Sequence, residues 1–190
     1  MKIHELGFER DQLPIYLGNK IKSKELKIGE IGVYEGEYAN VISSILPLSE
    51  IHLIDLWDPA ENDFFYSEFD INQMKGAYEK VRSRFNANPN VKILKGNSKE
   101  LFNNFEDEYF DWIYIDGDHS YEGVLSDLKN WTPKVKKGGA ISGHDFDPDL
   151  GWDVSLKFGV NRAIKDFFKD DDEIHLTNEP YYKSWVYFKK

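Results

Sequence analysis

The chain has 190 residues, a length that favours one domain. Its 24 Lys and Arg oppose 34 Asp and Glu, a formal net charge of −10 that disfavours nucleic acid and anionic membranes as partners. The lack of cysteine excludes disulfides, thiolate nucleophiles and cysteine-ligated metals. Charges interrupt the N-terminal segment, and no apolar run approaches the roughly 20 residues that span a bilayer. We therefore expect a cytoplasmic protein.

Short apolar runs alternate along the chain with segments of helical period. The apolar runs predict strands at residues 28–33, 51–56, 91–94, 110–115 and 140–142. The periodic segments predict helices at residues 38–46, 71–85, 101–105, 121–128 and 160–168. Two final runs, residues 173–177 and 185–188, predict a hairpin. This alternation is typical of a doubly wound, Rossmann-like α/β sheet that is mostly parallel and ends in an antiparallel hairpin strand.

The domain organisation follows from the same pattern. Residues 1–190 are expected to form one domain, because no stretch rich in Pro, Gly or Ser is typical of a linker. Residues 28–188 form the expected core, and the polar residues 1–27 are expected to form an N-terminal cap or lid. Residues 58–70, rich in aromatic and acidic side chains, are a second candidate lid, with an ordinary surface loop as the alternative.

Ligands of such sheets bind beyond the carboxyl ends of the strands, so the residues after each apolar run, here called strand tips, are informative. The first tip contains Gly32 and Gly36, which allow a ligand to approach the backbone. Their spacing differs from the dinucleotide pattern G-x-G-x-x-G. Glu30 and Glu35 beside them disfavour a pyrophosphate and suit a ligand that carries positive charge. The alternative is that both glycines only relieve a tight turn.

The second tip contains an acid and a tryptophan. Asp55 lies about 20 residues beyond the glycines, where an acid commonly binds both ribose hydroxyls of a nucleotide. Trp57 is a candidate for stacking on an adenine. The structural alternatives are that Asp55 caps the next turn and that Trp57 fills a gap in the core.

The fourth and fifth tips are the richest in metal-ligating side chains. Asp116, Asp118 and His119 follow one strand, and His144 and Asp145 follow the next. Neighbouring strand ends lie about 5 Å apart, so Asp116 and Asp145 are expected to share one site. Carboxylates suit Mg²⁺, and a histidine leaves Mn²⁺, Fe²⁺ or Zn²⁺ open. A structural alternative is that Asp118 or the following serine caps the next helix.

The motifs Asp-Gly-Asp-His-Ser-Tyr-Glu at residues 116–122 and Gly-His-Asp at residues 143–145 carry a family resemblance. The chain resembles class I S-adenosylmethionine-dependent methyltransferases over roughly residues 28–188. More narrowly, it resembles the group that includes macrocin-type sugar O-methyltransferases and cephalosporin-hydroxylase-like proteins. The first tip is similar to that superfamily's Glu-x-Gly-x-x-x-Gly variant. The resemblance implies a seven-stranded sheet with the last strand antiparallel.

The resemblance also implies roles for individual residues. The residues expected to bind S-adenosylmethionine are Glu30, Gly32, Tyr34, Gly36, Asp55, Trp57, Asn97, Ser98 and Asp116, with the glycines at the methionine end, Asp55 at the ribose, and Asn97 and Ser98 at the adenine. Asp116, His144 and Asp145 are expected to hold Mg²⁺ or another divalent cation. His144 stands where metal-dependent relatives have an acid.

The expected catalytic base is His119 or Asp118. Sugar methyltransferases have an aspartate that matches Asp118, and catechol-type relatives have a lysine where His119 stands. His119 is placed first because its reference pKa is about 6.5, against about 3.9 for an aspartate. The expected reaction is methylation of a hydroxyl on a small molecule or sugar, with a divalent cation assisting.

Two other functions are compatible with these residues. The Asp-x-Asp of Asp116 and Asp118 is also typical of metal-dependent glycosyltransferases. A non-catalytic cofactor-binding module is the second alternative, because fold does not fix function. Thirteen Phe and eleven Tyr leave room for an apolar interface in a homo-oligomer.

Overall fold

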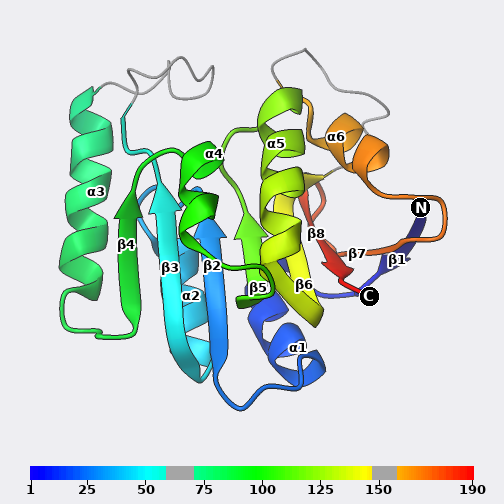
Figure 1. The fold of residues 1–190 in the computed structure, drawn as a ribbon, viewed down its shortest axis with the longest axis horizontal. Helices are drawn as coiled ribbons and strands as arrows, with labels where there is room; N and C mark the ends of the chain where they lie inside the picture. The colour runs from blue at the N-terminus through cyan, green and yellow to red at the C-terminus, as the bar shows by residue number, and fades with distance from the viewer. Residues whose placement is uncertain (59–70, 147–157) are drawn as a thin grey trace.

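The computed structural model describes residues 1–58, 71–146 and 158–190 (Figure 1). The candidate lid beyond Asp58 therefore lies outside the described residues. The strands are β1 (Lys2–Glu5), β2 (Leu26–Ile31), β3 (Leu48–Asp55), β4 (Val91–Lys95), β5 (Phe110–Ile115), β6 (Val135–Phe146), β7 (Glu173–Leu176) and β8 (Lys183–Phe188). The α-helices are α1 (Leu13–Lys20), α2 (Glu37–Ile45), α3 (Ile71–Phe85), α4 (Ser98–Leu101), α5 (Tyr121–Trp131) and α6 (Val160–Phe167).

All described strands form one sheet in the order β1-β7-β8-β6-β5-β2-β3-β4. Strand β8 runs antiparallel to β6 and β7, and the other neighbouring pairs are parallel. This arrangement confirms the doubly wound, mostly parallel sheet with an antiparallel C-terminal strand. The chain order reverses at β2, whose neighbours are β3 on one side and β5 on the other. Such a switch point is where open α/β sheets bind ligands.

The described residues form eight strands, one more than the seven expected. The additional strand, β1, pairs in parallel with β7 at the edge of the sheet, and its four residues are all exposed. With a single strongly apolar residue, Ile3, it carries no apolar run that would mark it as a strand, so only its pairing with β7 defines it. Residues 1–27, expected as a cap or lid, also contain α1, whose Leu13 and Leu17 are fully buried.

Helices cover both faces of the sheet (Figure 1). One core joins α1, α2 and α3 to the sheet, and a second core joins α5 and α6 to the opposite face. Strand β5 contributes to both, because Trp112 and Tyr114 belong to the first core and Ile113 and Ile115 to the second. Its unbroken apolar run is therefore explained by burial on two faces. Among the described helices, none is long and apolar enough to cross a bilayer.

Strand β6 is much longer than the expected residues 140–142. The glycine pair at residues 138–139 interrupts the apolar pattern but not the strand, whose register against β5 shifts between Val135 and Ala140. A second irregularity, opposite β8, lies between Gly143 and Phe146. There Asp145 adopts a φ of 64°, which is rare for a residue other than glycine. Irregularities of this kind redirect side chains at the end of a strand.

Candidate functional site

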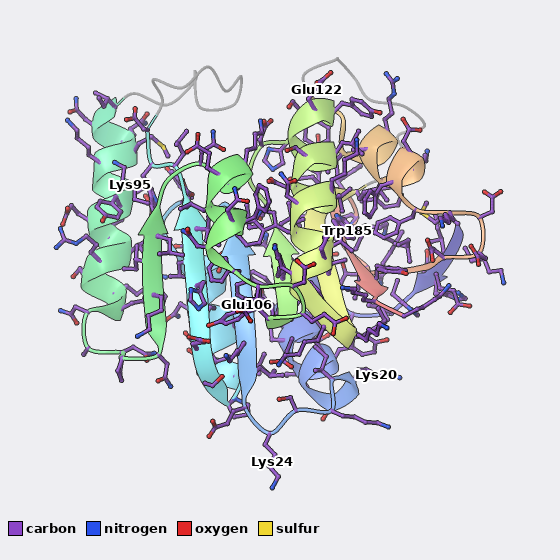
Figure 2. The ribbon with its side chains drawn as sticks, viewed as in Figure 1. Lys20, Lys24, Lys95, Glu106, Glu122 and Trp185 are labelled. Carbon is purple, nitrogen blue, oxygen red and sulfur yellow. The ribbon has the colours of Figure 1, made fainter. Side chains whose placement is uncertain are left out.

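The predicted strand tips gather at one end of the molecule. Strands β2, β3, β4, β5 and β6 all point toward the end where α5 begins, marked by Glu122 in Figure 2, while Lys24 marks the opposite end. The tips of β2 and β5 are joined by a hydrogen bond from the Asp116 N–H to the Ile31 carbonyl oxygen. The site is therefore built at the switch point of the sheet.

Asp55, the last residue of β3, binds the loop that follows β2. Its Oδ2 accepts hydrogen bonds from the backbone N–H groups of Val33 and Tyr34, both at 2.8 Å. Its Oδ1 accepts a third from the N–H of Trp57, also at 2.8 Å. The residue is only 3% exposed. Asp55 thus fixes the first two tips to each other, and its contact with a ribose stays a prediction.

The two aromatic side chains of these tips, both expected to bind the cofactor, differ in their exposure. Trp57 is 1% exposed, its ring lies 5.0 Å from that of Tyr78, and its indole N–H donates to the Tyr34 carbonyl oxygen at 2.8 Å. The indole thus fills the core, as the structural alternative states. Tyr34 is 43% exposed and has a φ of 50°, so its ring is the one presented to solvent here.

The two glycines of the first tip both have positive φ, and Gly32 packs against the tip of β5. Gly32 has a φ of 83°, and a Cβ at this position would lie 2.1 Å from the Asp116 carbonyl oxygen. Gly36 has a φ of 75° and is the N-cap residue of α2. Both positions therefore require glycine before any ligand is considered. Their proximity to the methionine end of a cofactor stays a prediction.

Glu30 places a buried carboxyl group near the end of β2. It is 2% exposed, and its Oε2 has no hydrogen-bond partner among the described residues. Burial and the charge of Asp116 raise its pKa well above the ordinary value, although Arg10 opposes this shift. A buried polar atom without a partner is costly, so a ligand that donates a hydrogen bond or brings positive charge would be stabilised here.

Asn97 and Ser98, expected near an adenine, follow β4. The Asn97 side chain accepts a hydrogen bond from the N–H of Lys99 at 2.9 Å and so caps α4. Ser98 Oγ donates to Asp127 Oδ1 at 2.7 Å. These contacts connect α4 to α5, and contact with an adenine stays a prediction.

The tips of β5 and β6 bring three potential metal ligands together. One ligand atom from each of Asp116, His144 and Asp145 lies within 4.8 Å of the others. Strand pairing explains this, because Ile115 is opposite Gly143 in the parallel β5–β6 pair. The structure thus confirms that the carboxyl groups of Asp116 and Asp145 lie close together. Their chemistry and separation fit a divalent cation.

His119 lies between the same two carboxylates. Its Nε2 is 2.8 Å from Asp145 Oδ2 and 3.4 Å from Asp116 Oδ1. Burial lowers the pKa of His119, but the hydrogen bonds and charges of these two acids outweigh it and raise the pKa to about 10. His119 is therefore an imidazolium at neutral pH in this arrangement. The reference pKa that placed it ahead of Asp118 as a base does not apply here.

Asp118 is part of the turn into α5. Its Oδ1 accepts a hydrogen bond from the N–H of Ser120 at 2.9 Å, and its Oδ2 is 3.2 Å from the Nζ of Lys99. Ser120 in turn caps α5, because its Oγ accepts from the N–H of Gly123. The structural alternative is thus confirmed for Ser120, which is the N-cap residue, whereas Asp118 stabilises the turn before the helix. A catalytic role of Asp118 stays a prediction.

Arg10 is a site residue that the sequence did not indicate. Its Nη1 lies 3.5 Å from Asp116 Oδ2, and its guanidinium carbon is 4.9 Å from the centre of the Tyr38 ring. Burial opposes its charge, but Tyr114 and Asp116 outweigh this and raise its pKa. An isolated arginine in a polar segment carries no periodic or motif signal, so only the fold reveals this contact.

Stability should depend on pH through His119. A group whose pKa is raised on folding contributes stability that is complete below its unfolded pKa, here 6.5, and that is lost as pH rises toward about 10. We expect the free energy of unfolding, measured with urea and a chelator, to fall as the pH rises from 6.5 toward about 10. His119→Gln should show a smaller fall. Equal falls in the two proteins would contradict the assigned ion pair.

The fold and the site define a doubly wound α/β domain whose strand tips bring acids and histidines together. A family model described as "Methyltransferase domain" matches residues 30–146. The chain belongs to this methyltransferase domain family. Protein R132 of Acanthamoeba polyphaga mimivirus, described as uncharacterized, is 36% identical over 56 residues. That alignment covers 30% of this chain and 25% of the relative.

Solved structures share the fold at low sequence identity. Spermidine synthase from Thermotoga maritima is 18% identical, with a TM-score of 0.60 over 96% of this chain and 60% of its own. Trans-methyltransferase CalH, solved with SAH, is 16% identical, with a TM-score of 0.59 over 94% of this chain and 54% of its own. A candidate caffeoyl-CoA O-methyltransferase from Staphylococcus aureus is 18% identical, with a TM-score of 0.61 over 94% and 80%. These likenesses concern the fold.

Proposed function

We propose that the protein transfers a methyl group from S-adenosylmethionine to a hydroxyl of a small molecule. The observation that carries the proposal is the family match over residues 30–146, which contains all five predicted strand tips. The narrower likeness to macrocin-type and cephalosporin-hydroxylase-like proteins is part of this proposal and supports a hydroxyl acceptor.

The charge of the site supports a sulfonium cofactor. The methyl donor is a cation, and positive charge at the switch point would relieve the repulsion between the Glu30 and Asp116 carboxylates that raises the pKa of Glu30. The unpartnered Oε2 of Glu30 lies in this same buried region. Negative charge at these acids would repel a pyrophosphate. The site is therefore better suited to a cation than to a nucleotide-sugar diphosphate.

A divalent cation remains part of the proposal. Asp116, His144 and Asp145 would hold it, and their ligand atoms lie close enough together to do so. When bound, such an ion lowers the pKa of a substrate hydroxyl. Asp118 and His119 are the candidate acceptors of the hydroxyl proton, and His119 could accept it only as the neutral imidazole, which a cation held by Asp116 and Asp145 would favour. His119 is already hydrogen-bonded within the acid cluster, whereas Asp118 is held by Ser120 and Lys99.

S-adenosylhomocysteine should raise the melting temperature, and UDP with Mn²⁺ should not. At about 100 times its dissociation constant, a ligand adds about 2.7 kcal/mol of stability, a shift of about 5–10 °C for a chain of this size. A shift with UDP alone would favour the glycosyltransferase alternative. Transfer of labelled methyl to hydroxylated acceptors, with and without a chelator, then tests turnover. Binding of S-adenosylhomocysteine without transfer to any acceptor would favour the non-catalytic module.

A further inference from the structure

A groove of about 410 Å³ opens beside the acid cluster. Residues 9–11 of the N-terminal segment form one wall, and residues 179–182 of the β7–β8 loop form the other. His144 lies on its lining and is also one of the three candidate metal ligands. The groove and the candidate metal cluster therefore share His144.

Aromatic contacts connect the groove to the same cluster. The ring of Tyr182 lies 5.8 Å from that of Phe158, which lies 5.8 Å from the ring of His119 in a stacked arrangement. His119 is in turn bound to Asp145. A ring seated against Tyr182 would therefore lie next to groups that contact the candidate reaction centre.

The loop wall presents two tyrosines to solvent. Tyr181 is 67% exposed and Tyr182 is 45% exposed. Adjacent exposed aromatic rings on a loop provide flat apolar faces, and their hydroxyl groups add hydrogen bonds. Such a wall suits a ring-shaped ligand that carries polar substituents.

The charges of the groove are predominantly acidic. Glu9, Asp11 and Glu179 line it, and Arg10, the cation on its lining, is paired with Asp116. Lys183 is next to this wall, but its Nζ donates to the Glu179 carbonyl oxygen at 2.9 Å and the residue is only 9% exposed. An anionic group would be repelled here, and an ammonium group would be attracted.

We propose that this groove binds the methyl acceptor and that the acceptor is a hydroxylated ring carrying an amine. The inference rests on the proposed methyl transfer and adds to it the location and charge of the acceptor. The acidic residues would accept hydrogen bonds from the amine and hydroxyl groups, and the tyrosines would pack against the ring. Acceptors linked to phosphate or to coenzyme A are disfavoured by the same charges.

Equilibrium binding of three simple probes tests the proposal without turnover. D-glucosamine, D-glucose and D-glucuronate differ mainly in charge, and each is titrated below neutral pH with S-adenosylhomocysteine present. We expect glucosamine to bind about fivefold tighter than glucose, and glucuronate more weakly than both. Equal or tighter binding of glucuronate would overturn the proposal, as would the absence of glucosamine binding.

Variants of the groove provide the second measurement. Tyr181→Ala should weaken glucosamine binding about tenfold, and Glu179→Gln should remove most of the preference over glucose. Glu106→Gln changes an exposed acid before β5, away from the strand tips (Figure 2), and should change neither. Unchanged binding in both groove variants would place the probe elsewhere. Because S-adenosylhomocysteine binding is measured separately, its loss would count against methyl transfer and not against the groove.

Discussion

Gly32→Ala should lower the free energy of unfolding by about 4 kcal/mol, the upper range of single substitutions. A φ of 83° is strained for alanine, and the added Cβ would lie 2.1 Å from the Asp116 carbonyl oxygen and 2.3 Å from its carbonyl carbon. Backbone atoms cannot rotate away as a side chain would, so the tips of β2 and β5 must separate. Urea denaturation followed by circular dichroism measures the loss.

Gly138→Ala is the matched control for this substitution. Gly138 has a similar φ of 75°, but a Cβ there would have no atom within 4 Å among the described residues. Only the backbone strain should remain, about 1 kcal/mol. Gly32→Ala should also weaken S-adenosylhomocysteine binding, whereas Gly138→Ala should not. Equal losses of stability in Gly32→Ala and Gly138→Ala would show that the close packing of the β2 and β5 tips does not constrain Gly32.

Asp55→Ala should lower the free energy of unfolding by about 3 kcal/mol. The substitution removes the acceptor of three hydrogen bonds at 2.8 Å, from the N–H groups of Val33, Tyr34 and Trp57. Buried donors would then be left without partners, which costs more than the net value of the bonds. Asp55→Asn should lose less, because the amide keeps one oxygen acceptor. Chemical denaturation measures both variants.

Asp111→Ala separates stability from ligand binding. Asp111 is a buried acid at the opposite end of the sheet, where its Oδ2 accepts a hydrogen bond from the N–H of Lys27 at 2.9 Å. Its loss should reduce stability and leave S-adenosylhomocysteine affinity unchanged. Asp55→Ala should reduce both, because it releases the loop after β2. Wild-type affinity in folded Asp55→Ala protein would remove Asp55 from the cofactor site.

Much of the fold follows from local patterns. The five internal apolar runs correspond to β2, β3, β4, β5 and β6. Burial on both faces explains the unbroken runs of β2 and β5, whereas the edge strand β4 is only partly buried. The final two runs correspond to β7, in which buried residues alternate with less buried ones, and to β8, whose first four residues are buried. Strand β1 was not predicted, because it carries no apolar run. Its exposed residues are extended because their backbone pairs with β7, and the pattern of side chains along the sequence does not reveal such pairing.

The meeting of Asp116 and Asp145 was predictable, since it needs only two adjacent parallel strands. The state of His119 was not, because its pKa depends on both carboxylates at once. The burial of Trp57 likewise depends on the loop that Asp55 holds in place. In each case the missing information was a contact between segments distant in the sequence.

The sequence by itself determined a single acidic α/β chain without cysteine, whose strands end in glycines, acids and histidines. Its excess of negative charge excluded polyanions as favourable partners and, at the tips, suited a cationic cofactor. Only the tertiary structure decided which acids are already paired: His119 and Arg10 offset Asp116, whereas Glu30 keeps an unpartnered Oε2 among the described residues. The reason is that the net charge follows from the composition, whereas the pairing of each acid with a positive group depends on distance and burial. Only the folded structure sets these two quantities.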